Sequence, residues 1–105
     1  MSLSDGGLVQ KDPSDIAVYG FNWAAELGDA LIVTSTFTVD GLRGDLTTTP
    51  LTLDAADIGA DEQSTTFRLS AGALGSKWRV NNKIVTNETP AQTLERSGFI
   101  KLEQR

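Results

Sequence analysis

Carboxylates are the side chains of this chain most able to do chemistry, and one group of four lies close together in sequence. Asp54, Asp57, Asp61 and Glu62 could offer hard oxygen ligands to Ca²⁺. The group lacks the D-x-D-x-D-G spacing that brings such ligands to a single point. A solvated acidic loop over 54–63 is therefore the favoured interpretation, and we expect no metal site.

A second acidic group, Asp12, Asp15 and Glu26, could in principle supply the acid and nucleophile of a glycosidase. Such a pair needs a cleft and tuned pKa values, and a domain this small rarely encloses a pocket. The chain has no His and no Cys, which excludes a Ser–His–Asp triad and a thiol nucleophile, and it has no S-x-x-K motif. We therefore expect no catalytic residue and no cofactor, and a small hydrolase is the least favoured class.

Three aromatic residues, Tyr19, Phe21 and Trp23, alternate with smaller residues and so share one face of a predicted strand. They could form a platform on which a sugar stacks. Large aromatic residues on one strand face more often fill the layer between two sheets, and we expect that here. A carbohydrate- or receptor-binding module remains the alternative function.

Composition excludes several classes of partner. The 105 residues suffice for one domain with a core, and 14 acidic against 9 basic residues give a net charge of −5. Because the longest basic cluster in the sequence is Lys77 with Arg79, we expect no nucleic acid partner. The N-terminus lacks the pattern of a signal peptide, and no apolar run reaches membrane-spanning length, so we expect no membrane association.

Period-two alternation, interrupted by Gly, Asn and Asp turns, predicts strands along most of the chain. The predicted strands lie at 16–23, 31–39, 51–53, 65–69, 78–84 and 92–102, with a further short one possible at 8–10. Asp40-Gly41 is typical of a turn and should end the second of these strands. We predict an all-β fold, an immunoglobulin- or fibronectin III-like β-sandwich of six to seven antiparallel strands.

The same pattern divides the chain in two. Residues 1–13 are polar and Gly-rich, which predicts a flexible N-terminal arm, and Pro13 makes its end a rigid lead-in. Residues 14–105 form the sandwich. Shared parity on successive strands predicts nine core residues: Phe21, Trp23, Val33, Phe37, Phe67, Leu69, Trp78, Val80 and Ile84.

The sequence also predicts the local structure around four polar or irregular positions. Asn82 shares the inward parity and should be a satisfied buried amide. Arg96 also has inward parity and needs a partner, with Glu26 or Asp29 as candidates. Gly98 indicates a bulge that switches the faces of the last strand. The Trp78 indole could tie a strand to the preceding corner, as a tyrosine does in immunoglobulin-like sandwiches.

From Lys11 onward the chain resembles the small immunoglobulin-like structural proteins of tailed bacteriophage virions, sometimes described as fibre–tail adaptor proteins. The matching elements are Lys11-Asp12-Pro13, Tyr19, Trp23, Gly28-Asp29, Ile32, Ser35-Thr36-Phe37-Thr38-Val39, Gly72, Gly75, Trp78, Val80, Asn82, Thr86 and Glu95-Arg96-Ser97. The sequence departs from the family pattern at Phe37, where Trp is expected, and at Trp78, where Tyr is expected. Gly98 inserts one residue before the final aromatic.

This resemblance implies a non-enzymatic structural protein of the virion, assembled in the host cytoplasm, and an adaptor or decoration subunit near the tail or neck. Its expected partners are other virion proteins and further copies of itself in a homo-oligomer. A loose arm can order against a neighbour, and an unpaired strand edge invites pairing. We therefore predict that partners bind at Leu8, Val9, Lys11, Pro13, Thr34, Thr36 and Thr38.

Overall fold

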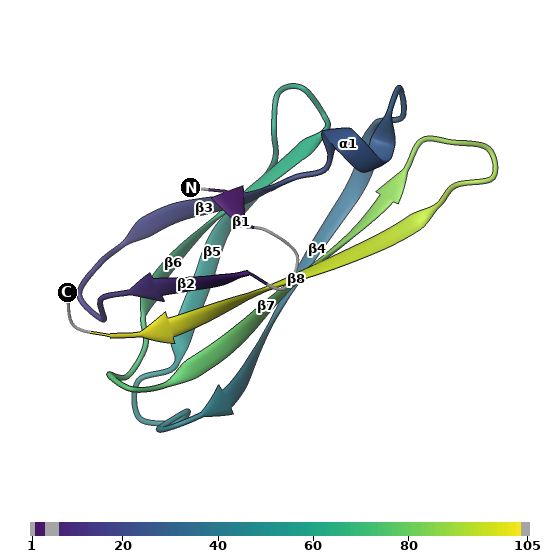
Figure 1. Ribbon diagram of the computed structural model, residues 1–105. Helices are drawn as coiled ribbons and strands as arrows, with labels where there is room; N and C mark the ends of the chain where they lie inside the picture. The colour runs from purple at the N-terminus through teal and green to yellow at the C-terminus, as the bar shows by residue number, and fades with distance from the viewer. Residues whose placement is uncertain (1, 4–6, 104–105) are drawn as a thin grey trace.

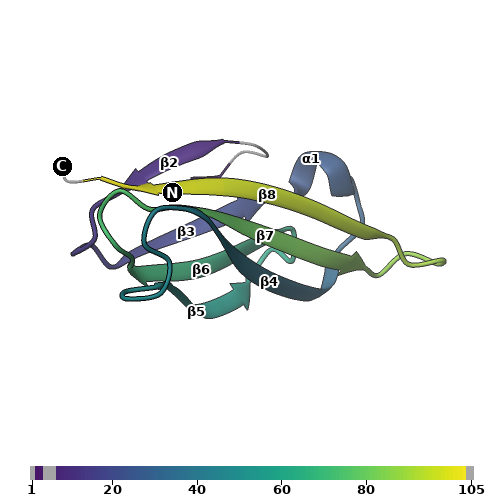
Figure 2. The same ribbon diagram turned by 90° about the horizontal axis from the view of Figure 1, so that it is seen from below.

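Two four-stranded sheets face each other across a layer of apolar side chains (Figures 1 and 2). The structure, a computed structural model, describes residues 2–3 and 7–103, and the side chains from residue 7 onward. Its elements are β1 (Ser2–Leu3), β2 (Leu8–Lys11), β3 (Ala17–Asn22), α1 (Ala24–Leu27), β4 (Ile32–Arg43), β5 (Leu51–Ile58), β6 (Ser64–Ala71), β7 (Lys77–Thr86) and β8 (Thr93–Leu102).

The first sheet, sheet A, has the order β1-β3-β6-β5, and sheet B has the order β2-β8-β7-β4. The prediction of an all-β, two-sheet sandwich is confirmed. The expected strand count and direction need correction, because eight strands form in the described residues and two of them are parallel to their neighbours. The short strand β1 runs parallel to β3, and β2 runs parallel to β8.

The N-terminal segment therefore contributes to both sheets. Leu8 to Lys11 pair in register with Phe99 to Leu102. The Lys11 side chain is fully buried, and its Nζ donates hydrogen bonds to the carbonyl oxygens of Asp12 (2.9 Å) and Ala71 (3.0 Å). The strand expected as possible at 8–10 is thus present, and this part of the predicted arm lies along β8.

Aromatic rings fill the centre of the sandwich, as predicted. The Phe67 ring lies 4.9 Å from that of Phe37, 6.0 Å from Phe21 and 6.1 Å from Tyr19, measured between centroids. Trp23 is buried beside Phe21. The three aromatic residues at 19, 21 and 23 are thus core residues, and they offer no exposed stacking platform. The predicted core members that the structure buries are Phe21, Trp23, Phe67, Leu69, Trp78, Val80 and Ile84.

The prediction for Val33 is wrong, since its side chain is 56% exposed and Ile32 is buried in its place. The pairing of β4 with β7 shifts between Ile32 and Thr34, where one extra residue reverses the inward parity. Beyond this bulge Ser35, Phe37 and Val39 point inward, so the inward position predicted for Phe37 is confirmed. Phe37 packs on the core but is only partly buried.

Two strands extend further along the chain than the sequence predicted. β4 continues through the expected turn at Asp40-Gly41 to Arg43, with Gly41 opposite Trp78. A side chain at Gly41 would collide with Leu46, whose Cδ1 lies 2.6 Å from the position of an added Cβ. β5 continues to Ile58, so Asp54 and Asp57 lie in a strand and the predicted acidic loop is shorter.

Gly98 makes no bulge, which corrects the expectation for β8. It lies directly opposite Val80 in an unbroken register with β7, and its neighbours Ser97 and Phe99 pair in sequence with Asn81 and Arg79. Gly98 is buried on the same face as Ile100. Phe99 therefore occupies an ordinary outward position on β8. There the Lys77 ammonium lies over the Phe99 ring, 5.4 Å from the ring centroid.

Asn82 ties the two sheets together and is fully satisfied, as predicted. Its Oδ1 accepts hydrogen bonds from Trp23 Nε1 (3.0 Å) and Thr65 Oγ1 (2.7 Å) on the side of sheet A. Its Nδ2 donates to Ser35 Oγ (2.9 Å) and to the Thr36 carbonyl (3.2 Å) on β4. A buried amide with all four bonds made specifies one register between the layers.

Two further polar ties stabilise the ends of the sandwich. The Trp78 indole donates to Ser76 Oγ (2.9 Å), and Ser76 Oγ donates to the Ala73 carbonyl (2.6 Å), so Trp78 is tied to the corner as anticipated. At the opposite end Arg96 pairs with Glu26, one of its two predicted partners. The Arg96 guanidinium also stacks on the Trp23 ring, 4.6 Å from the centroid.

Candidate docking surfaces

One lateral side of the sandwich is closed by the N-terminal segment. β1 extends sheet A beside β3 and β2 extends sheet B beside β8, so a single stretch of chain covers both (Figure 1). Under it, Ile100 and Leu102 are fully buried and Val9 packs on the core. The outward-pointing Leu8 is 55% exposed.

The opposite lateral side, between β4 and β5, is open. One depression there, of ≈ 510 Å³, is lined by Ile32, Val33, Ile58 and Glu62. A second one of ≈ 200 Å³ is lined by Ser35, Phe37, Ala56, Asp57 and Ile58. The apolar interior therefore reaches the surface along this side.

The two strands that border the open side differ in how their free edges are protected. β5 has a register shift between Asp54 and Asp57 and carries both carboxylates, and such features discourage pairing with another strand. β4 has no charged residue and no proline from Ile32 to Val39. The available edge of this side is therefore that of β4.

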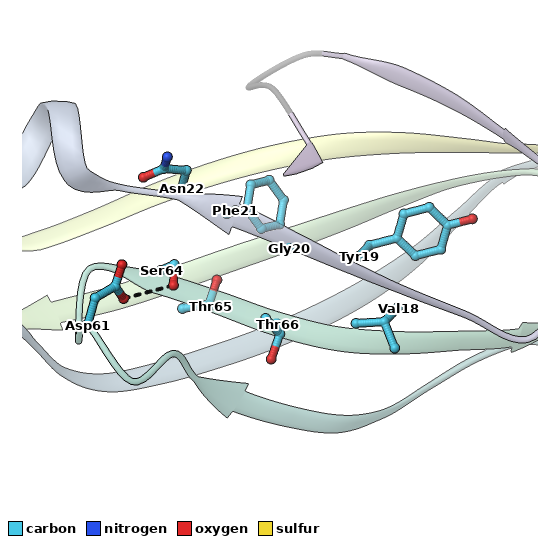
Figure 3. Close-up of a pocket in the computed structure, with 9 residues that line it drawn as sticks. All are labelled: Val18, Tyr19, Gly20, Phe21, Asn22, Asp61, Ser64, Thr65 and Thr66. Atoms are coloured by element: carbon cyan, nitrogen blue, oxygen red, sulfur yellow. Dashed lines mark hydrogen bonds between the residues drawn. The ribbon is translucent and has the colours of Figure 1, made fainter. Parts of the chain in front are cut away.

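A shallow depression of ≈ 340 Å³ lies on the outer face of sheet A, over β3 and β6 (Figure 3). Gly20 forms its floor, and an added Cβ there would lie 2.6 Å from the Thr65 carbonyl oxygen, so only glycine fits. Asp61 at its rim accepts hydrogen bonds from the Gln63 amide (3.0 Å) and Ser64 Oγ (2.9 Å). The hollow therefore has a mixed lining, in which apolar surface predominates and Asp61 contributes one carboxylate at the rim.

The seven predicted partner-binding residues fall into two groups. Thr34, Thr36 and Thr38 lie exposed on the outer face of the edge strand β4, and Leu8 is exposed on β2. The remaining three are less accessible: Lys11 is fully buried, Val9 faces the core, and Pro13 is partly buried in the turn after β2.

Three carboxylates, Asp45, Asp54 and Asp61, have lowered pKa values. The Asp45 pKa is lowered mainly by the hydrogen bond from the Thr48 amide, and the Asp54 pKa by hydrogen bonds from Arg68. The Asp61 pKa is lowered mainly by the Gln63 amide and the Ser64 hydroxyl. Each of these carboxylates therefore loses its proton more readily than an ordinary aspartate.

The short basic cluster of Lys77 with Arg79 is part of a larger basic surface on the outer face of sheet B, which sequence reasoning missed and which also holds the carboxylates Asp40 and Glu95. Its five basic residues are Arg43, Lys77, Arg79, Lys83 and Lys101, which come from three strands. Register brings together side chains as distant in sequence as Arg43 and Lys101. Apart from Lys77 and Arg79 these residues are scattered in the sequence, so only the strand pairing could have shown that they share one surface.

The described part of the chain shows no cluster of three or more acidic residues placed to hold a metal ion. It also forms no helix with the length and apolar character needed to cross a membrane.

Comparison with curated proteins gives no match. The sequence model of the family described as podophage GP4 fiber-tail adaptor protein gp77 matches residues 11–101. The matched region starts at the buried Lys11 and includes β3 to β7 and nearly all of β8. Because this covers most of the chain, the protein belongs to the Gp77 family of podophage fiber-tail adaptor proteins.

Proposed function

We propose that this protein is a non-enzymatic subunit of a phage virion, an adaptor near the tail or neck that docks neighbouring virion proteins. The observation that carries the proposal is the family match over residues 11–101. Its mechanism is positional: a rigid sandwich, braced by Asn82, holds docking surfaces in a fixed relation to one another.

We infer that the sandwich is of the immunoglobulin type. In that fold four strands ordered A-B-E-D face strands C, F and G. If β1 and β2 are the two halves of strand A, the orders β1-β3-β6-β5 and β2-β8-β7-β4 correspond to this arrangement. The Trp78 tie to the corner between β6 and β7 stands where that fold places its tyrosine corner.

Docking in this proposal uses two regions. The N-terminal arm up to Pro13 provides one of them, with its anchoring part before the paired strand β2. The free edge of β4, with Thr34, Thr36 and Thr38, provides the other. An unpaired edge without charges supports this role, because it can accept a strand from a neighbour.

The experiment is complementation of a phage that lacks this gene with truncated protein. Deleting residues 2–7 removes the two-residue strand β1 but leaves β2 and the buried Lys11 in place, so the purified variant should stay folded with nearly the same circular dichroism spectrum. We expect it to be lost from particles. If it enters virions at the normal copy number, the arm is not the anchor and docking must depend on the sandwich itself.

A further inference from the structure

The outer face of sheet B carries five basic residues and two carboxylates, Asp40 and Glu95, although the chain as a whole has a net charge of −5. Arg43, Lys77 and Lys101 lie directly opposite one another in a single row across β4, β7 and β8. Adjacent strands are about 4.8 Å apart, so three like charges lie within roughly 10 Å. Such an alignment is unfavourable for the isolated sheet.

This row is only partly neutralised. Lys101 pairs with Glu103 (2.7 Å), whereas Arg43 and Lys77 form no ion pair with any carboxylate among the described residues. Beside the row, Arg79 pairs with Asp40 (2.8 Å). Two cations are therefore available to an anionic partner on a flat surface.

An acidic surface lies at the other end of the molecule. Asp29, Glu62 and Glu88 are exposed in three loops, which follow α1, β5 and β7 and lie at the same end of the sandwich, from the top centre to the right of Figure 1. None of the three pairs with a Lys or Arg in the described part of the chain.

Hydrogen bonds hold these loops in place. Gln63 Nε2 donates to the carbonyls of Gly28 (2.7 Å) and Ala30 (3.1 Å). The Leu31 amide donates to Asn87 Oδ1 (2.9 Å), and the Asn87 amide donates to the Leu31 carbonyl (2.9 Å). The carboxylates are thus presented from a fixed frame.

The two surfaces are too far apart to stabilise each other within one chain. Lys77 begins β7 and Glu88 follows its end, so about ten residues of extended strand, or roughly 30 Å, separate them. This is several times the screening length of about 8 Å at physiological salt. Their opposite charges can therefore act only between molecules.

We propose that the cationic row of one copy binds the acidic loop end of a second copy, in a head-to-tail contact. Such a heterologous interface joins copies in series, and it closes into a ring when the rotation between them allows. The contact goes beyond the proposed function and is a property of the purified chain, so its test is independent of assembly into particles.

The main experiment measures self-association of the full chain by sedimentation velocity. Between about 50 mM and about 500 mM salt, the dissociation constant should rise at least about tenfold, because the attraction is between exposed charges. Arg43→Glu with Lys77→Glu, and separately Glu62→Lys with Glu88→Lys, should each abolish association. Melting temperatures near that of the parent chain show that each variant is folded.

Mixing the two double variants provides the decisive result. Alone, each presents like charges on both surfaces, but in a 1:1 mixture the acidic row of one faces the basic loops of the other. Association should therefore return in the mixture. The control Asp57→Lys, which adds positive charge on β5 outside both surfaces, should associate like the parent chain.

A second measurement needs no variant. A zero-length carbodiimide reagent couples carboxylates to lysine amines, and mixing isotope-labelled with unlabelled chains identifies intermolecular products. We expect links from Lys77 or Lys101 to Asp29, Glu62 or Glu88. A monomeric parent chain, a mixture that stays monomeric, or a cationic row that instead retards DNA in a gel would each overturn the proposal.

Discussion

The two lateral sides of the sandwich differ in how completely the chain covers the core. On one side the N-terminal segment adds β1 and β2, and the core beneath it is fully buried at Ile100 and Leu102. On the other side β4 and β5 leave two depressions, and Phe37 is only partly covered. The chain completes one side by itself, and it leaves the other side with a free edge and apolar surface. This contrast suggests that stability depends more on the first and contact with neighbours more on the second.

The largest expected effect tests how open the β4–β5 side is. Phe67→Ala should lower the free energy of unfolding by about 3–5 kcal/mol, since Phe67 is fully buried among aromatic rings. Phe37→Ala should cost roughly half as much, because part of its surface is already in water. Chemical denaturation measures both. Equal losses would mean that Phe37 is as enclosed as Phe67, which would contradict an open side.

A smaller effect is expected at the closed side. Lys11→Met keeps the volume of the side chain but removes the bonds to the carbonyls of Asp12 and Ala71, and should cost about 1–3 kcal/mol. Gln10→Met is the matched control, since Gln10 is exposed on the same strand. If both variants melt at the temperature of the parent chain, the two hydrogen bonds of the Lys11 side chain do not stabilise the closed side.

The next prediction separates stability from docking. Thr38→Lys adds a charge to the exposed face of β4 and should change stability by less than about 0.5 kcal/mol. It should nevertheless reduce incorporation into particles in the complementation assay. Thr52→Lys makes the same exchange on β5, the other edge strand of this side, and should incorporate normally. Identical incorporation of the two variants would remove β4 as the preferred edge.

The smallest effect is a dependence of stability on pH. The lowered pKa values of Asp45, Asp54 and Asp61 mean that folding favours their charged forms relative to the ordinary value of 3.8. Their contribution is present above that value and is lost as the pH falls through the pKa of the folded state. Melting temperatures between about pH 5 and about pH 2.5 should therefore fall, and less steeply for Asp61→Asn. An unchanged slope in that variant would exclude Asp61 as a contributor.

The sequence was most informative where strands are fully paired on both sides. β6 and β7 alternate regularly, and their inward residues Phe67, Val80 and Ile84 were predicted correctly, whereas in β8 the glycine at 98 wrongly indicated a bulge. The edge strand β4 was harder, because one extra residue at its bulge exposes Val33 and buries Ile32. Periodicity contains no signal for such an insertion, since either parity is locally acceptable.

The docking surfaces could be predicted only in part. The exposed threonines of β4 follow from local alternation, and their exposure was foreseen. The buried state of Lys11 and the cationic row depend on which strands become neighbours. Arg43 and Lys101 are far apart in sequence and meet only through β7. Composition indicated an acidic protein and could not show that its charges are separated by face.

The parallel pairing of β2 with β8 has a mechanical consequence. These are the first strand of sheet B along the chain and its last, and they run in the same direction over Leu8–Lys11 and Phe99–Leu102. Tension applied between the two ends of the chain therefore pulls the strands past each other in shear. The backbone hydrogen bonds that join them share the load and must break together, whereas bonds peeled from one end break in succession. Resistance to such a load depends on the height of the unfolding barrier, so this short ladder gives the domain mechanical strength along the direction that joins its termini.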